Sequence, residues 1–335
     1  MMQQNQLQGA LSSQFDTVLE TMEGIATSYF LSGRLEQALQ ILQVGRLLLS
    51  MPEVTTHAQA RFLLQYGRTL TLKTQFENAP EDEAIAVLQQ VQQLAKQLDD
   101  PQLIADAVDS IGFAGYTAAS NRREGDPSLL QGYFQEALER RQALQDQRGC
   151  SESLFHLGLI EDIIDQPEQA HRYYTQALQL ARQHNHPREA AEALRHLGFQ
   201  AQRQGRPAEA QQYFRRALRM AEQSEMQVYI PFAHVALADV YLEQKELDRA
   251  SEHARKALEL AQSMDIKRAH IFALFSNGSI CQARGDTKLA RDYYEQAHAL
   301  AQTIGLGYAI QRAGDALQQL AENTDSQLSA QEQEQ

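Results

Sequence analysis

The chain has 335 residues, 43% of them hydrophobic, which is enough material for a large buried interior or for two ordinary domains. Its 43 Asp and Glu outnumber its 30 Lys and Arg, and the formal net charge of −13 would repel a phosphate backbone, which argues against a nucleic-acid partner. No apolar run approaches the roughly 18 residues of a membrane span, and no signal peptide is apparent. The two cysteines show no metal-ligand spacing. We therefore expect a cytoplasmic protein with reduced thiols and no membrane partner.

The Gln-rich start, residues 1–13, is poor in apolar side chains, so we expect disorder there. From residue 14 onward one pattern recurs, centred on a small residue that is Ala26, Gly67, Gly112, Gly158, Gly198, Ala238 and Gly278 in turn. The last three intervals are each 40 residues, and the earlier ones are 41, 45 and 46. Repeats therefore organise the chain, with copies near 16–50, 57–98, 102–146, 150–185, 188–225, 229–265 and 268–304.

Each copy predicts two amphipathic helices joined by a turn. In the first helix, apolar residues lie three and four apart, as in Leu194, Leu197 and Ala201. A turn with Gly or Pro follows, as in "RQGRPAEA". The second helix repeats a spacing of small, aromatic and small residues, as in Ala210 and Phe214 followed by Ala217. We expect a Gly or Ala on one helix to open the gap that a ring on its partner fills.

These copies resemble tetratricopeptide (TPR) repeats, in which Leu-Gly in helix A is followed by Ala, an aromatic residue and Ala in helix B. The 40-residue period resembles the longer-helix variety of kinesin light chains and bacterial peptide-sensing regulators. The resemblance implies an all-α, right-handed α-solenoid of about seven TPR hairpins. Residues 308–322 read as a capping helix, so 14–322 would form one domain. We expect disorder in the tail, 323–335.

The longer intervals point to insertions between helix A and helix B. "KTQFENAPED" adds about five residues to the second copy, and "SNRREGDPS" adds about six to the third. We expect two long loops that project together from one edge of the solenoid.

Several polar groups invite a chemical interpretation, but none supports it. His184 and His186 precede Pro187 in a polar link and lack a third ligand, so we expect no metal site. Asp162 and Asp165 read as a solvated helix end. His156 and His196 occupy the same repeat position, which favours packing. No catalytic or nucleotide-binding motif occurs, so we expect neither enzyme activity nor a cofactor.

The remaining face of helix A is the better functional candidate. In TPR proteins this face lines a concave groove, and the equivalent positions here are rich in aromatic and basic residues. The candidate binding residues are Arg61, Arg68, Phe113, Tyr116, Phe155, Arg195, Phe199, Phe232, Phe272 and Phe275. Acidic residues follow the same path, namely Asp106, Asp109, Glu152, Glu192 and Asp239. The alternative is that these rings pack between neighbouring repeats.

The groove predicts a non-catalytic scaffold that binds a protein or a peptide. The Lys and Asn clamp of TPR cochaperones is absent, because the equivalent pairs include Leu64 with Arg68 and Asp109 with Phe113. Two other functions stay open: a ligand-sensing module that acts on a separately encoded effector, and a scaffold that associates with itself. Neither the partner nor the oligomeric state follows from the sequence.

Overall fold

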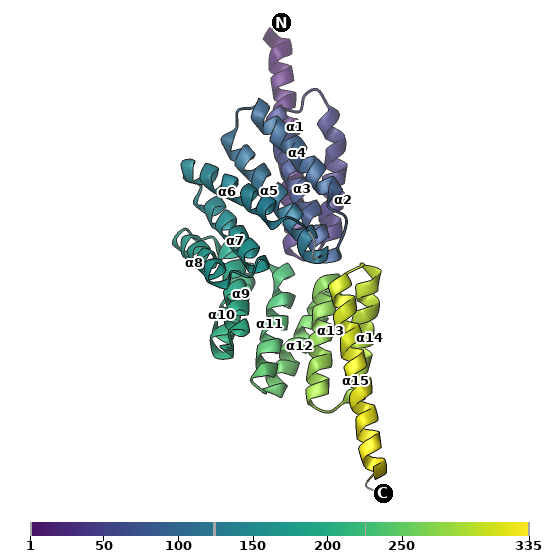
Figure 1. Cartoon of the computed structure of the whole chain (residues 1–335). Helices are drawn as coiled ribbons and strands as arrows, with labels where there is room; N and C mark the ends of the chain where they lie inside the picture. Colours follow the sequence, from purple (N-terminus) through teal and green to yellow (C-terminus); the bar gives the residue numbers. More distant parts are fainter. Residues whose placement is uncertain (1, 123–124, 225, 334–335) are drawn as a thin grey trace.

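Helical hairpins follow one another along the whole body of the molecule (Figure 1). The computed structural model describes residues 2–122, 125–224 and 226–333, and every regular element in these ranges is helical. The α-helices pair as α1 with α2 through to α13 with α14, and α15 covers the last pair. The predicted all-α solenoid of seven hairpins and a capping helix is confirmed. The bounds are α1 Met2–Leu31, α2 Leu35–Arg46, η1 Leu47–Ser50, α3 Thr56–Glu77, α4 Asp82–Gln97, α5 Pro101–Arg122, α6 Pro127–Ala143, α7 Gln147–Ile163, α8 Pro167–Gln183, α9 Pro187–Arg203, α10 Pro207–Gln223, η2 Gln227–Tyr229, α11 Ile230–Glu243, α12 Leu247–Ser263, α13 Lys267–Ala283, α14 Thr287–Thr303 and α15 Gly307–Gln333.

Small residues in helix A receive the aromatic rings of helix B, as the repeat pattern predicts. The ring of Phe214 is 0% exposed and lies against the backbone of Gly198 in the paired helix. A Cβ at Gly198 would overlap that ring. Gly158 receives Tyr174, and Gly278 receives Tyr294, in the same way. In these three repeats the pairing therefore depends on the absence of a side chain at one position of helix A.

The two insertions lengthen helices instead of forming loops. Helices α3 and α5 each contain 22 residues, whereas α7, α9 and α13 contain 17. The expectation of long loops is therefore wrong, because most of the added residues continue the hydrogen-bonded helix by about one more turn. Both extensions do lie together at one edge, since the Asn121 side chain donates to the Thr74 carbonyl at 2.8 Å. Their position matters for the closure of the superhelix.

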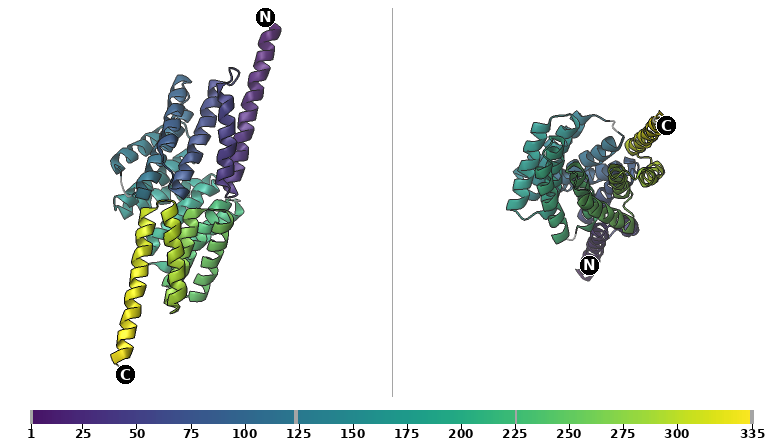
Figure 2. Two further views of the ribbon diagram at one scale, coloured as in Figure 1. Left: turned by 90° about the vertical axis from the view of Figure 1, so that its right-hand side faces the viewer. Right: turned by 90° about the horizontal axis from the view of Figure 1, so that it is seen from below.

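The superhelix returns on itself, so that the last repeats meet the first (Figure 2). The contact joins the extended ends of α3 and α5 to the starts of α13 and α15. Asn78 donates to the carbonyls of Ile304 and Gly305, both at 3.0 Å. Arg268 donates to the Gln75 carbonyl at 2.6 Å and to the Asn121 side chain at 2.7 Å. We call this set of interactions the closure contact.

Apolar packing reinforces the closure contact. The rings of Phe76 and Phe232 stack with their centroids 5.7 Å apart, and Phe76 is 4% exposed. One hydrophobic cluster includes residues of the first three repeats together with Val228, Ile266 and Ala269. The two ends of the repeat array therefore share a core.

Helices α1 and α15 both extend past the packed body, into the segments where composition predicts disorder (Figure 1). Gln is a good helix former, so the Gln-rich composition of these segments is compatible with a helix. The limits of the packed domain at 14 and 322 stay a prediction.

The Gly198 pairing predicts a large effect of a side chain at that position. Gly198→Leu should lower the free energy of unfolding by about 3 kcal/mol through overpacking against Phe214. The matched control is Gly132→Leu, since Gly132 is exposed on α6 and a Cβ there meets nothing within 4 Å. Urea unfolding should show a clear loss for the first variant and none for the second. Equal midpoints would contradict the pairing.

Candidate functional site

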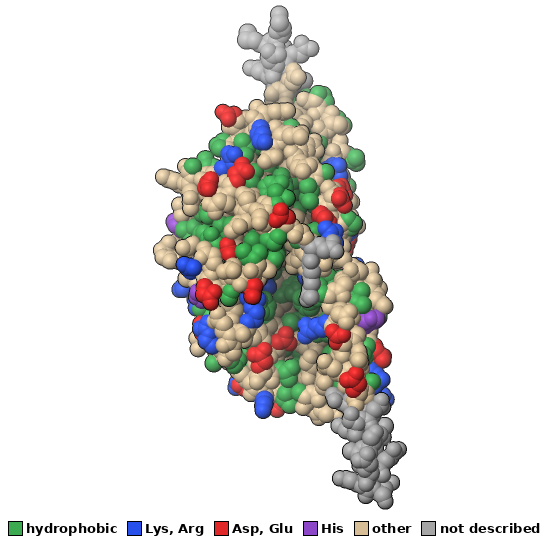
Figure 3. All heavy atoms as spheres, in the orientation of Figure 1, with side chains coloured by type: hydrophobic (Ala, Val, Ile, Leu, Met, Phe, Trp, Pro, Cys, Tyr) green, Lys and Arg blue, Asp and Glu red, His purple; other side chains and the backbone are tan. Residues whose placement is uncertain are grey.

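The closed superhelix surrounds a cavity of about 630 Å³. Its walls come from the helices A of the first five repeats, with Tyr229, Phe232, Arg268 and Phe272 from the sixth and seventh. In Figure 3 the surface is hollowed between the two halves of the body, and hydrophobic side chains lie within the hollow. The closure contact holds these two halves together, so the cavity depends on it.

A buried arginine organises the charged end of the cavity. The side chain of Arg141 reaches from α6 toward α5 and α7 and is 1% exposed. Its guanidinium lies 3.0 Å from Asp109, 3.0 Å from Glu152 and 2.7 Å from Asp106. It also donates to the Ser153 hydroxyl at 2.8 Å. Three carboxylates from two helices therefore share one cation.

Asp109 is the most deeply buried of these carboxylates, at 2% exposure. Burial alone would raise its pKa, but the charges of Arg141 and His156 and the hydrogen bond from Ser153 outweigh burial and hold the pKa well below its usual range. Nδ1 of His156 lies 2.9 Å from Oδ2 of Asp109, and the Ser153 hydroxyl donates to Oδ1 at 2.8 Å. Asp109 is therefore ionised at neutral pH.

The same cluster includes a possible metal-ligand set. One ligand atom from each of Asp109, Glu152 and His156 lies within 4.8 Å of the others. The guanidinium of Arg141 already lies 3.0 Å from both carboxylates and supplies the positive charge that a metal ion would bring. We therefore assign the cluster to an ion-pair network and not to a metal centre.

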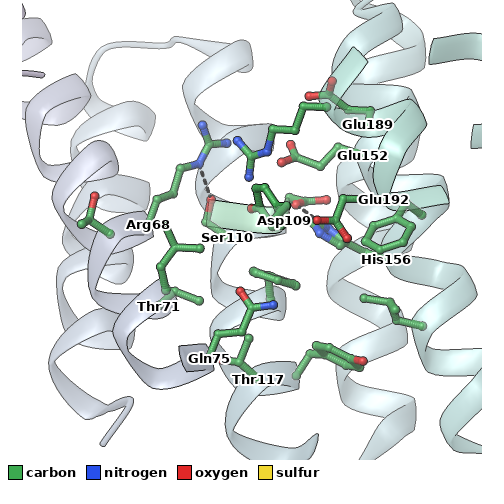
Figure 4. A pocket seen from close by; sticks show the side chains of 18 of the residues that line it. Arg68, Thr71, Gln75, Asp109, Ser110, Thr117, Glu152, His156, Glu189 and Glu192 are labelled. Carbon is green, nitrogen blue, oxygen red and sulfur yellow. Dashed lines mark hydrogen bonds and ion pairs between the residues drawn. The ribbon is translucent and has the colours of Figure 1, made fainter. Parts of the chain in front are cut away.

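Other polar groups face the cavity around this network (Figure 4). Arg68 on α3 donates to the Ser110 hydroxyl at 3.0 Å and lies 3.4 Å from Asp106. Glu189 and Glu192 come from α9, where Glu192 pairs with Arg195 at 2.6 Å. Arg68 keeps 36% of its side chain exposed, so it combines a positive charge with access to the cavity.

The opposite end of the cavity is aromatic. Phe30 contacts both Phe76 and Tyr229 there, with ring centroids 6.5 and 6.3 Å apart. Phe232 and Phe272 continue the wall, with Arg268 positioned over the Phe272 ring at 5.8 Å. Apolar surface at one end and charge at the other suit a ligand that has both characters.

Seven of the ten candidate binding residues line this cavity, namely Arg68, Phe113, Tyr116, Phe155, Arg195, Phe232 and Phe272. The other three lie elsewhere. Arg61 extends toward α1, 3.7 Å from Glu20 and 3.8 Å from Glu23. Phe199 packs edge-on against Phe214, 5.1 Å between centroids, and Phe275 is 1% exposed beside Tyr294. The structure therefore shows Phe199 and Phe275 packed between helices.

The acidic residues divide in a similar way, whereas His156 and His196 both line the cavity. Asp106, Asp109, Glu152 and Glu192 line the cavity, but Asp239 does not. Burial raises the pKa of Asp239 to about 6, although Ser276 donates to its carboxylate at 2.6 Å. Both histidines lie among rings, but only His156 lies beside a carboxylate, that of Asp109, whereas burial holds the pKa of His196 well below the usual value. Equal repeat positions thus give unequal surroundings.

Arg141 was not predicted from the sequence, although this arginine stands at a position of helix B that is Ala in the other repeats from the second onward. The equivalent position of helix B is Ala95, Ala181, Ala221, Ala261 and Ala301 in the other repeats from the second onward, and each of these alanines is buried. A second missed set lies at the start of helix A, where Arg148, Arg188 and Arg268 follow the 40-residue period and all line the cavity. Both positions fall outside the face of helix A from which the candidate binding residues were taken.

Removing the shared cation should destabilise the fold. Arg141→Met should lower the free energy of unfolding by about 3 to 5 kcal/mol at pH 7, since Asp109 and Glu152 would stay buried without a counter-charge. Arg140→Met is the matched control, because Arg140 is the neighbouring residue on α6 and its side chain is 40% exposed. Denaturant titrations at pH 7 measure both.

The pH dependence of the same variant has a defined sign. In the wild type the pKa of Asp109 is depressed, so its contribution to stability is complete above about pH 4 and is lost as the pH falls through the folded-state value. Without Arg141, burial dominates and raises that pKa, so acidification from pH 7 to 4.5 should narrow the gap between variant and wild type. A gap that widens over this range would contradict the assignment.

Comparisons with known proteins agree with this architecture. The family model described as "MalT-like TPR region" matches residues 128–329, more than half of the chain. A sequence comparison with curated proteins finds no match. One solved structure with the same fold is a Rap protein complexed with Competence and Sporulation Factor, which shares 14% identity at a TM-score of 0.53, over 91% of this chain and 99% of that chain. Another is the apo form of RapI, which shares 13% identity at a TM-score of 0.58, over 86% of this chain and 98% of that chain.

A third similar structure is a Signal Transduction ATPase with Numerous Domains from Pyrococcus horikoshii, which has a tetratricopeptide repeat sensor. It shares 15% identity at a TM-score of 0.56, over 93% of this chain and 46% of that one. At these identities the likenesses show the fold alone. The family match shows more, and together with the seven helical hairpins it means that this chain is a TPR protein and belongs to the family of the MalT-like TPR region.

Proposed function

We propose that this protein binds a short peptide in the cavity on its concave face and has no catalytic activity of its own. The observation that carries the proposal is a cavity of about 630 Å³, closed by contact between the two ends of the superhelix. Pockets for small ligands measure about 300 to 1,000 Å³. A ligand of a few residues therefore suits this space better than the surface of a folded partner.

The walls indicate the character of the peptide. Phe76, Phe232 and Phe272 would accept apolar side chains at one end. At the other end Arg68 offers a guanidinium that a carboxylate of the ligand can approach. The Gln75 side chain lies beside the cavity between these ends (Figure 4), where its amide can bond to a peptide backbone.

The fold relationship supports a bound factor, because a Rap protein of the same architecture was crystallised with Competence and Sporulation Factor. A location in the cytoplasm fits the free thiols of Cys150 and Cys281. None of the helices in the described ranges combines the length and hydropathy that crossing a bilayer requires. We place neither nucleic acid nor a membrane among the partners.

A second candidate function is sensing, in which a bound ligand changes the superhelix and thereby a surface for an effector. The closure contact favours it, because it joins repeats far apart in the chain through the polar bonds of Asn78 and Arg268 and the apolar packing beside them. A ligand that binds better to the open or the closed form would shift the balance between the two.

Peptide binding predicts a difference between two phenylalanines. Phe113→Ala should weaken binding at least tenfold, because Phe113 lines the cavity, whereas Phe199→Ala should change it less than twofold. A pool of synthetic heptapeptides of random sequence, captured by the wild type and identified by mass spectrometry, supplies the ligand, and calorimetry measures affinity. Equal losses in both variants, or no peptide enriched over a denatured-protein control, would refute the cavity as the site.

Sensing predicts that loosening the closure contact changes molecular shape. Asn78 adopts φ 57°, so Asn78→Gly removes the bonds to Ile304 and Gly305 without straining the backbone. The radius of gyration from small-angle scattering should rise. Asn185→Gly is the control, because Asn185 has φ 55° and is exposed at another helix end. Identical scattering from the wild type and Asn78→Gly, with and without captured peptide, would exclude sensing through the closure contact.

A further inference from the structure

The outer face of α1 has an apolar stripe that only partly packs against the protein. Leu11, Phe15, Val18, Met22 and Ile25 alternate at spacings of four and three residues, which is the pattern of two helices packed side by side. Phe15 and Met22 are partly buried against the body. Leu11, Val18 and Ile25 are 38%, 46% and 42% exposed. Two of the five side chains of the stripe therefore pack against the body, and the other three face outward.

The two ends of the solenoid differ in this respect. A terminal repeat normally presents a polar outer face, because no further repeat covers it. The exposed residues of α15 between positions 311 and 322 fit that rule, since apart from Ala321 they are Gln, Arg, Asp and Glu. The α1 end instead presents three large aliphatic side chains.

The surface around this stripe has few charged side chains, although the chain has a net charge of −13. The acids of α1 lie on the side of α3: Asp16 accepts from the hydroxyl of Thr55, the N-cap of α3, at 2.8 Å, and Glu20 and Glu23 lie 3.7 and 3.8 Å from Arg61. The exposed residues on the same face of the helix as Val18 are Gln14, Thr17 and Thr21, which are uncharged, whereas the exposed Glu20 lies on the opposite side near Arg61. Two acidic copies would repel each other over most of their surfaces but not here.

We propose that two copies of this chain associate through α1, packed antiparallel about a two-fold axis near Val18. Leu11 and Ile25 lie seven residues on either side of Val18, so each Leu11 would meet the partner's Ile25 and the two Val18 side chains would meet each other. Antiparallel packing also opposes the two helix dipoles. This dimer is independent of the ligand proposed for the cavity.

The interface is small. From Leu11 to Ile25 the helix is about 20 Å long. A contact of that length lies at the low end of specific interfaces, so we expect a Kd on the order of 10 to 100 µM.

Sedimentation velocity of the full chain from about 1 to 300 µM tests the association. The wild type should shift from monomer to dimer, and Val18→Glu should stay monomeric, because two carboxylates would face each other. Leu289→Glu is the matched control, since Leu289 is an aliphatic residue of α14 with 40% exposure, and it should dimerise like the wild type. A wild type that stays monomeric, or equal loss in both variants, would overturn the proposal.

Disulfide trapping tests the geometry in a Cys281→Ser background, with Cys150 left in place because it is buried. Val18→Cys should oxidise to a covalent dimer. Leu11→Cys alone should not, but mixed with Ile25→Cys it should give a heterodimer. A covalent homodimer of Leu11→Cys would mean parallel packing and would overturn the antiparallel arrangement. Circular dichroism on each variant confirms that the fold is retained.

Discussion

The rings of Phe76 and Phe232 stack where the end of the second repeat's helix A meets the start of the sixth repeat. Around them Asn78 and Arg268 bond to backbone carbonyls of the opposite half. An array of repeats in which each contacts only its neighbours has no reason to close. The added turns of α3 and α5 provide that reason, because they place the residues that reach across. The concave face thereby becomes a cavity that is lined by residues of all seven repeats and opens at the surface (Figure 3).

Closure changes what the aromatic residues can do. In an open groove they would offer a broad surface to a large partner, whereas here they enclose about 630 Å³. At the charged end Arg141 binds carboxylates from α5 and α7 and has 1% of its side chain exposed. A buried network of this kind adds little net stability over an apolar replacement, but here its ion pairs join three helices through one side chain. Arg68, at the cavity edge, keeps a charge that a ligand can reach.

Sequence reasoning succeeded where the physics is local. The Gly198 and Phe214 pairing, the two-helix unit and the terminal cap follow from side-chain size and periodicity within one repeat. It found seven residues of the cavity wall because one face of helix A lies on the concave side in every repeat. It placed Phe199 and Phe275 on that face too, because a difference of one position along a helix rotates a side chain by about 100°. Arg141 was not predicted because binding residues were taken from helix A only and helix B was assigned to packing.

The sequence by itself determined that this chain is an all-α solenoid, because a repeated hydrophobic period can bury its apolar face only by stacking on its neighbours. It also determined that a ring of helix B packs on the glycine of helix A in the fourth, fifth and seventh hairpins. The tertiary structure alone decided that the ends meet, that the extra residues of the second and third repeats become helix, and that Arg268 and Asn121 come together. Those contacts join residues more than a hundred positions apart, and no local pattern encodes the curvature that brings them within bonding distance.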